Sequence, residues 1–285
     1  MLDMQPKVTA VIRKNLSFKG PSLGDARTSE SFEPVMASAD KVATIRSVVS
    51  SSLDLLDLKY WPSEVIVDLE SEAEMIFPDG FKELIPVSLI VSQQQPSKSS
   101  IRMGMWEIEG NSRAFESILA HEMGHMLPEW ISRSAGITSP NEPFLTHWDK
   151  PIYEGVADWT SAVITGRTII GSEDLWFCRD ILKWDSRAES QNTIGEMSRL
   201  ITSALGQNGL LKFRAYREWA ELVNRYLGDK PDPYAEGQWI ASQLWKVSSG
   251  QRFAKNIFAA IQKIAEDGEK LESSEDFLIK IRSHL

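Results

Sequence analysis

The stretch Ala120-His121-Glu122-Met123-Gly124-His125-Met126 decides how the rest of this chain is interpreted. It has the pattern HExxH and lies in a segment, 112–127, whose apolar residues recur at helical spacing. Residues four apart are separated by about 400° around an α-helix, so His121 and His125 lie one turn apart on one face. Their imidazoles can converge on a single metal ion. Glu122 is rotated by about 100° from His121, too far to be a third ligand, but it can contact a water molecule that the metal holds.

The alternative to a metal site is that HExxH occurs by chance on an amphipathic helix, as short patterns of this kind do. Two observations favour a metal site. The chain has four histidines, and two of them fall in this motif. The surrounding residues are those of a buried helix, where imidazole and carboxylate groups are costly unless they are paired or metal-bound. The flanking apolar residues are Phe115, Ile118, Leu119, Met123 and Met126.

A second motif, Glu154-Gly155-Val156-Ala157-Asp158, lies on the next predicted helix. A catalytic zinc site needs a third protein ligand and keeps its fourth position for water. Glu154 follows His125 by 29 residues, which leaves room for a loop and for a helix packed across the first. Asp158 lies one turn further along the same face, where its carboxylate can accept the second ring N–H of a ligand histidine.

Solvated acids on a surface helix are the alternative for Glu154 and Asp158. The small residues Gly155 and Ala157 favour close packing against another helix instead. The two motifs together therefore predict a metal site made of His121, His125 and Glu154.

The chain divides by its periodicity into a mixed α/β first half and an all-helical second half. In the first half, apolar spacing and β-branched runs predict helices and strands, with Pro128 ending the HExxH helix. The predicted helices are 39–60, 112–127 and 151–166, and the predicted strands are 64–69, 86–91 and 101–108. The helices predicted beyond residue 172 are 172–184, 190–205, 211–227, 235–248, 251–267 and 274–284.

We therefore expect an α+β protein in three parts. Residues 1–36 show no period and are predicted to be an extended arm or tail, with a propeptide as the alternative. Residues 37–130 form the α/β subdomain with the HExxH helix. Residues 131–285 form an all-α subdomain that supplies the third zinc ligand.

The composition is that of an ordinary globular protein of 285 residues, with 42% hydrophobic and 25% charged residues. A formal net charge of −9, without any basic block, argues against nucleic acid or an anionic membrane as the main partner. The longest apolar run, 85–91, is too short to span a bilayer. The single cysteine, Cys178, excludes an intrachain disulfide and a cysteine-based metal cluster. The first residues lack the features of a signal peptide, so the chain as written is expected in the cytoplasm, whereas a longer precursor would permit export.

HExxH at 121–125 followed by E-G-x-A-D at 154–158 resembles the gluzincins, the zinc peptidases that include the thermolysin-like and fungalysin-like enzymes. The resemblance covers roughly residues 100–250. It implies a zincin-like fold, in which a cleft separates an α/β subdomain from a helical one. It also implies one catalytic Zn²⁺, a peptide or protein substrate, and Glu122 as the general base.

A later gluzincin segment carries a histidine that stabilises the transition state, and residues 232–245 resemble that segment. Tyr234 stands in the place of the histidine here, and a phenol can also donate a hydrogen bond to an oxyanion. His147, in the loop before the second motif helix, is the other candidate donor. Ordinary packing is the alternative for Tyr234, and a local loop hydrogen bond is the alternative for His147.

The missing histidine motivates a second hypothesis, a zincin-like binding or regulatory protein without proteolytic activity. A third hypothesis is a helical scaffold that holds no metal.

Overall fold

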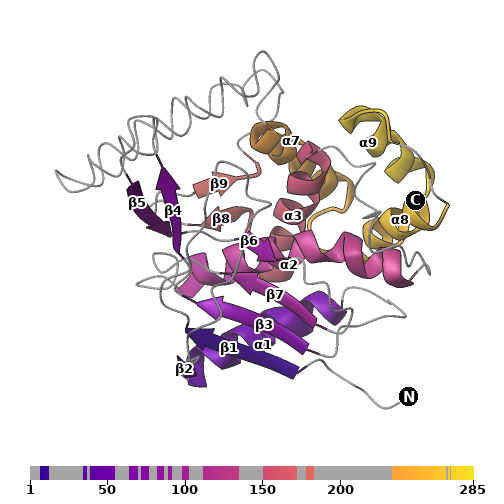
Figure 1. Ribbon diagram of the computed structural model, residues 1–285. Helices are drawn as coiled ribbons and strands as arrows, with labels where there is room; N and C mark the ends of the chain where they lie inside the picture. The colour runs from indigo at the N-terminus through magenta and orange to yellow at the C-terminus, as the bar shows by residue number, and fades with distance from the viewer. Residues whose placement is uncertain are drawn as a thin grey trace.

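The computed structural model describes residues 7–12, 35–36, 39–54, 64–69, 72–76, 82–86, 89–91, 98–102, 112–134, 150–171, 178–182, 233–267, 269 and 271–285. These residues form an α+β structure with more helix than strand (Figure 1). In this part of the chain no helix combines the length and the apolar character needed to cross a membrane.

A five-stranded mixed sheet underlies the first half of the chain, with the strand order β2-β1-β3-β7-β6. Strands β1 and β7 run parallel to the central strand β3, while the edge strands β2 and β6 are antiparallel to their neighbours. The side chains of Val65 and Val67, two residues apart on β3, are both buried, as expected for one face of a strand. The strands are β1 (Lys7–Ile12), β2 (Val35–Met36), β3 (Glu64–Leu69), β6 (Leu89–Val91) and β7 (Lys98–Arg102).

The segment predicted as an arm, 1–36, contributes β1 and β2 to this sheet. Strand β1 pairs with β3 along its whole length, from Lys7 opposite Glu64 to Ile12 opposite Leu69. The sequence of β1, KVTAVI, is rich in β-branched residues, but six residues are too few to reveal a period without their partner strand. The division of the chain at residues 36 and 130 stays a prediction.

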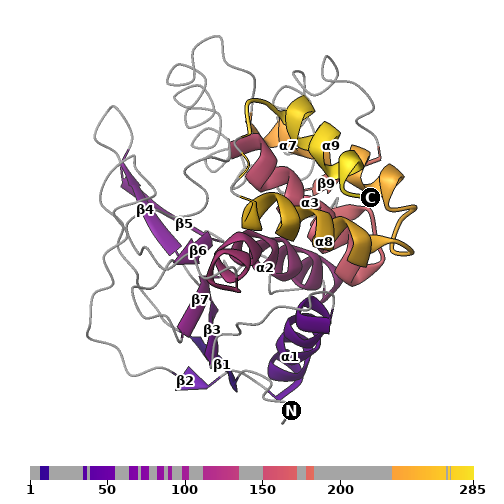
Figure 2. The same cartoon turned by 90° about the vertical axis from the view of Figure 1, so that its right-hand side faces the viewer.

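Two helices lie on one side of the sheet. Figure 2 shows α1 (Ala39–Asp54) and α2 (Ser112–Ser134) next to each other on that side, and the two helices contact each other as well as strands of the sheet. Ile45, Val48 and Val49 are the buried positions that join α1 to the core. A separate antiparallel pair, β4 (Glu72–Ile76) and β5 (Lys82–Pro86), completes the first half.

Helix α2 continues through Pro128, so the prediction that this proline ends the helix is wrong. A proline inside a helix removes one backbone hydrogen bond and costs about 3 kcal/mol. Helix α2 nevertheless continues past the proline, and it packs against α3 and α8.

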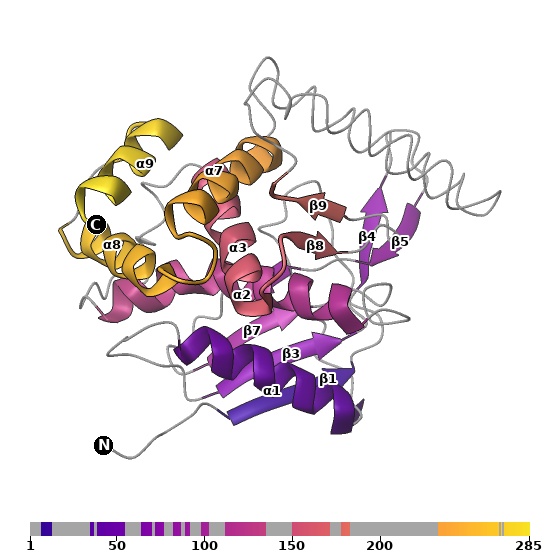
Figure 3. The ribbon, with the colours of Figure 1, turned by 180° about the vertical axis from the view of Figure 1, so that it is seen from behind.

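The second half is built on α3 (Lys150–Thr165), which packs between α2 and α7 (Pro233–Val247). Helices α8 (Ala254–Glu266) and α9 (Ser274–Ser283) lie beside these three helices, as Figure 3 shows from behind. Helix α8 contacts α2, and α9 contacts α3 and α7. Four predicted helices, 151–166, 235–248, 251–267 and 274–284, are confirmed to within three residues at each end. The predicted helices 190–205 and 211–227 lie outside the described residues.

A short antiparallel pair, β8 (Ile169–Gly171) and β9 (Cys178–Asp180), interrupts the predicted all-helical half. The helix predicted over 172–184 is therefore wrong at residues 178–180. Gly171 has a φ of 83°, a left-handed conformation that a helix does not accommodate and that favours glycine. Burial of Ile170 and Ile181 against the core holds the pair in place.

Candidate metal centre

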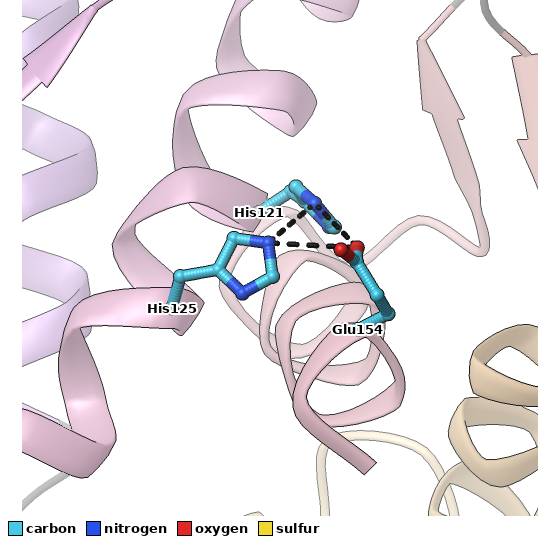
Figure 4. Close-up of side chains that lie close together, drawn as sticks. All are labelled: His121, His125 and Glu154. Carbon is cyan, nitrogen blue, oxygen red and sulfur yellow. Dashed lines mark hydrogen bonds and ion pairs between the residues drawn. The ribbon is translucent and has the colours of Figure 1, made fainter. Parts of the chain in front are cut away.

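His121 and His125 lie on successive turns of α2 and direct their rings toward the carboxylate of Glu154 on α3 (Figure 4). The two Nε2 atoms are 3.1 Å apart. The Oε2 atom of Glu154 lies 3.5 Å from each of them. Three groups that commonly bind metal ions thus meet at one point, although 29 residues separate His125 from Glu154 in the sequence.

The three side chains are almost fully enclosed, with exposed fractions of 5% for His121, 8% for His125 and 5% for Glu154. Glu154 Oε2 and His125 Nδ1 have no hydrogen-bond partner among the described residues. A buried carboxylate oxygen facing two imidazole nitrogens is costly unless a cation joins them. The donor set, two imidazoles and one carboxylate, is one that Zn²⁺ prefers.

Buried acids surround the triad. Glu122, Glu154 and Asp158 are buried acids on the two motif helices, and Arg179 is a buried base beside them. A cation held by the triad residues would add positive charge next to these acids.

Asp158 lies one turn after Glu154 on α3 and is completely buried. Its Oδ1 atom is 2.7 Å from Nδ1 of His121, the ring nitrogen that faces away from His125. The orienting role of Asp158 stays a prediction, which this distance permits. A carboxylate on the second ring nitrogen fixes which nitrogen of the imidazole faces the metal.

Arg179 is a residue of the site that the sequence analysis missed. It lies on β9, and its Nη2 atom is 2.8 Å from Asp158 Oδ1. The same atom is 3.4 Å and 3.5 Å from the two ring nitrogens of His121, and Nη1 is 4.0 Å from Glu154. Arg179 was missed because the sequence analysis placed it in a predicted helix over 172–184. A signal was nevertheless present, because a buried site with several acids needs a basic partner.

The environment shifts the pKa of His121, Glu154 and Asp158. Burial, followed by the charges of His125 and Arg179, holds the pKa of His121 well below its ordinary value. Burial alone would raise the pKa of Glu154, but His125, His121 and Arg179 outweigh it and lower this pKa to about 2. Burial raises the pKa of Asp158 to about 7, against the opposing effect of Arg179. His121 is therefore neutral and Glu154 ionised at neutral pH, the states in which both bind metals.

Glycine and alanine residues let the three helices approach closely enough to form the centre. A β-carbon on Gly124 of α2 would lie 2.6 Å from the Cα of Ala157 on α3. A β-carbon on Gly155 of α3 would lie 2.7 Å from the carbonyl oxygen of Gly237 on α7. Real β-carbons do not come this close to backbone atoms, so the predicted close packing around Gly155 and Ala157 is confirmed.

The structure thus brings together His121, His125, Glu154 and Asp158. Glu122 follows His121 on α2 and is buried, with an exposed fraction of 6%. Tyr234 belongs to the first turn of α7, and its side chain lies outside what the structure describes. His147 also lies outside the described residues.

A second group of possible ligands, Asp267, Glu269 and His284, gathers near the C-terminus. Lysines already neutralise its acids, because Lys263 contacts Asp267 and Lys280 lies 3.3 Å from Glu269. All three possible ligands are also accessible to solvent. This group lacks the burial that distinguishes the centre on α2 and α3.

Comparison with protein-family models, with curated proteins and with solved structures finds no match to this chain. The chain is therefore classified by the chemistry of its site. It contains a buried His-His-Glu group, on helices α2 and α3, that could hold a metal ion.

Proposed function

We propose that this chain is a zinc-dependent peptidase in which His121, His125 and Glu154 hold the ion. The convergence of these three side chains, each at most 8% exposed, carries the proposal. The motif order, HExxH and then E-G-x-A-D, supports it through the resemblance to gluzincins stated above. A peptide or protein is the substrate class that follows.

When bound, zinc would lower the pKa of a water ligand toward about 7 and would polarise the substrate carbonyl. Glu122 accepts the proton that the attacking water gives up and delivers it to the departing amine. Its position next to His121, rotated by about 100° around the helix, suits this role better than direct coordination. Asp158 keeps His121 oriented throughout, because it lies 2.7 Å from the second ring nitrogen.

Tyr234 and His147 are the proposed donors to the oxyanion that forms as water adds to the peptide carbonyl. One such donor is typically worth about 3 kcal/mol in the transition state. The first turn of α7 supports the choice of Tyr234, because Gly237 of the same turn packs directly against Glu154.

The proposal is tested by hydrolysis of a denatured protein mixture, with and without a chelator. We expect the purified chain to hold zinc close to one ion per chain and to lose hydrolysis when the metal is removed. Glu122→Gln should keep the zinc and abolish hydrolysis, because it removes the base and leaves the ligands intact. Wild-type protein without zinc would overturn the metal site itself.

A metal-binding or regulatory protein without peptidase activity is the second candidate. The absence of the third-motif histidine at position 234 favours it. Zinc bound at one ion per chain, with no hydrolysis that responds to chelator, would select this candidate over the first.

A further inference from the structure

Tyr153 lies directly before Glu154 on α3 and makes two contacts with the ligand His125. Its hydroxyl donates a hydrogen bond of 2.9 Å to the backbone carbonyl oxygen of His125. Its ring stacks on the His125 imidazole, with the centroids 4.3 Å apart and the planes inclined by 22°. One tyrosine therefore contacts both the backbone and the side chain of a single residue on the neighbouring helix.

The two histidines of the centre are held in different ways. His121 has a carboxylate at its second ring nitrogen, since Asp158 lies 2.7 Å from Nδ1. The corresponding Nδ1 atom of His125 is buried and has no hydrogen-bond partner among the described residues. Within this part of the chain, the His125 ring is therefore oriented by ring contacts, namely the stack on Tyr153 and an edge contact with His121.

The stacked Tyr153 ring limits rotation of the His125 imidazole. A hydrogen bond at Nδ1 would limit the same rotation, but the described residues provide none. Rotation of the His125 ring about its Cα–Cβ or Cβ–Cγ bond would break the stack at 4.3 Å. The hydrogen bond from the Tyr153 hydroxyl fixes the distance between α2 and α3 at the same turn. Nε2 of His125 consequently stays directed toward Glu154 and Nε2 of His121 (Figure 4).

We propose that Tyr153 is a positioning residue that presets His125 for metal binding, as Asp158 does for His121. The inference rests on the proposed metal site. It gives α3 three separate tasks within two turns: Tyr153 orients one ligand, Glu154 is itself a ligand, and Asp158 orients the other. The hydroxyl of Tyr153 is engaged with a backbone carbonyl, so the proposal assigns it no contact with substrate.

The test compares Zn²⁺ affinity, measured by competition with a chromophoric chelator, between wild type and variants of Tyr153. Removing an orienting partner typically costs 10–100-fold in metal affinity. We expect Tyr153→Leu and Tyr153→Met to lose at least about tenfold, because both remove the stacked ring. Tyr153→Phe keeps the ring and should lose less than about tenfold, the effect of one neutral hydrogen bond.

Ile164→Ala provides the matched control, because Ile164 is a half-buried apolar residue of the same helix at a distance from the centre. It should lower stability without changing Zn²⁺ affinity. A readout without metal is the proton resonances of the His125 ring in the nuclear magnetic resonance spectrum. The Tyr153 ring current should shift them in wild type and Tyr153→Phe but not in Tyr153→Leu.

Two results would overturn the role of Tyr153 alone. One is a Zn²⁺ affinity equal to that of wild type in folded Tyr153→Leu and Tyr153→Met. The other is a set of His125 ring signals that do not change when the tyrosine ring is lost. Failure of the wild-type chain to bind Zn²⁺ would overturn both this role and the proposed metal site.

Discussion

Gly237 of α7 lies against Glu154 of α3, so that a β-carbon on Gly237 would be 2.8 Å from the β-carbon of Glu154. The third candidate ligand is thus in contact with a helix that begins almost 80 residues later in the sequence. The position of the Glu154 carboxylate consequently depends on how closely α7 can approach.

Gly237→Ala is therefore expected to weaken metal binding as well as stability. The added methyl group must push Glu154 or the backbone of Gly155 away, and overpacking of this kind costs about 1–3 kcal/mol. Zinc titration and urea unfolding measure the two effects. Gly155→Ala, whose added β-carbon meets the carbonyl oxygen of Gly237 and the side chain of Ile240 on α7, is the comparison variant. It should lower stability by a similar amount with a smaller loss of affinity, and equal Zn²⁺ affinity in Gly237→Ala and wild type would contradict the prediction.

The close packing at Gly155 and strand β3 were predictable from the sequence, whereas strands β1 and β9 and the role of Arg179 were not. A motif with fixed helical spacing, such as HExxH, determines its own geometry, because residues four apart must share a face. The placement of Glu154 followed from the need for a third ligand. By contrast, β1 and β9 are short strands that form by pairing with β3 and β8. The apolar spacing within such a short segment does not indicate its partner strand.

Arg179→Met is expected to destabilise the protein strongly. Its Nη2 atom lies 2.8 Å from Asp158, and removal of one partner of a buried ion pair costs about 3–5 kcal/mol. Arg167→Met is the matched control. Arg167 lies 3.2 Å from Glu116 but is partly exposed, so its loss should cost less than about 1 kcal/mol. Urea unfolding of the metal-free proteins measures the difference, and similar losses in the two variants would show that Arg179 is not a structural partner of Asp158.

Acid should destabilise the metal-free protein in part through Glu154. The pKa of this carboxyl is lowered from 4.5 to about 2 in the folded state, so the unfolded chain binds more protons between these values. The contribution of Glu154 to stability is complete above pH 4.5 and is lost as the pH falls toward 2. Glu154→Gln removes this contribution. The difference in unfolding free energy between wild type and Glu154→Gln, measured in chelator, should therefore shrink from pH 5 to pH 2.5, and a constant difference would rule out the lowered pKa.

Tyr234→Phe tests the proposed oxyanion donor. Removal of one donor typically lowers kcat by about 10²–10³-fold, and Tyr234 is not a proposed ligand, so zinc content should stay unchanged. His147→Ala is measured beside it, because both residues are candidates for the same role. The variant with the larger loss of kcat identifies the donor. Unchanged kcat in both would remove Tyr234 and His147 from the mechanism.

Glu154 and Glu236 offer a direct comparison of two buried carboxylates, one among the three proposed ligands and one outside that group. Glu236 of α7 accepts a hydrogen bond of 2.6 Å from the hydroxyl of Ser274 on α9, and its exposed fraction is 6% against 5% for Glu154. Glu236→Gln should therefore lower stability and leave Zn²⁺ affinity unchanged. Glu154→Gln should lower Zn²⁺ affinity by more than about 100-fold, because even the partners that orient metal ligands are worth 10–100-fold.

Since both changes replace a buried carboxylate by an amide of the same shape, a general loss of folding would affect the two variants alike. If Glu154 is a metal ligand, Glu154→Gln should have a much lower Zn²⁺ affinity than Glu236→Gln. Equal Zn²⁺ affinities in the two variants would show that Glu154 contacts His121 and His125 but has no role in metal binding.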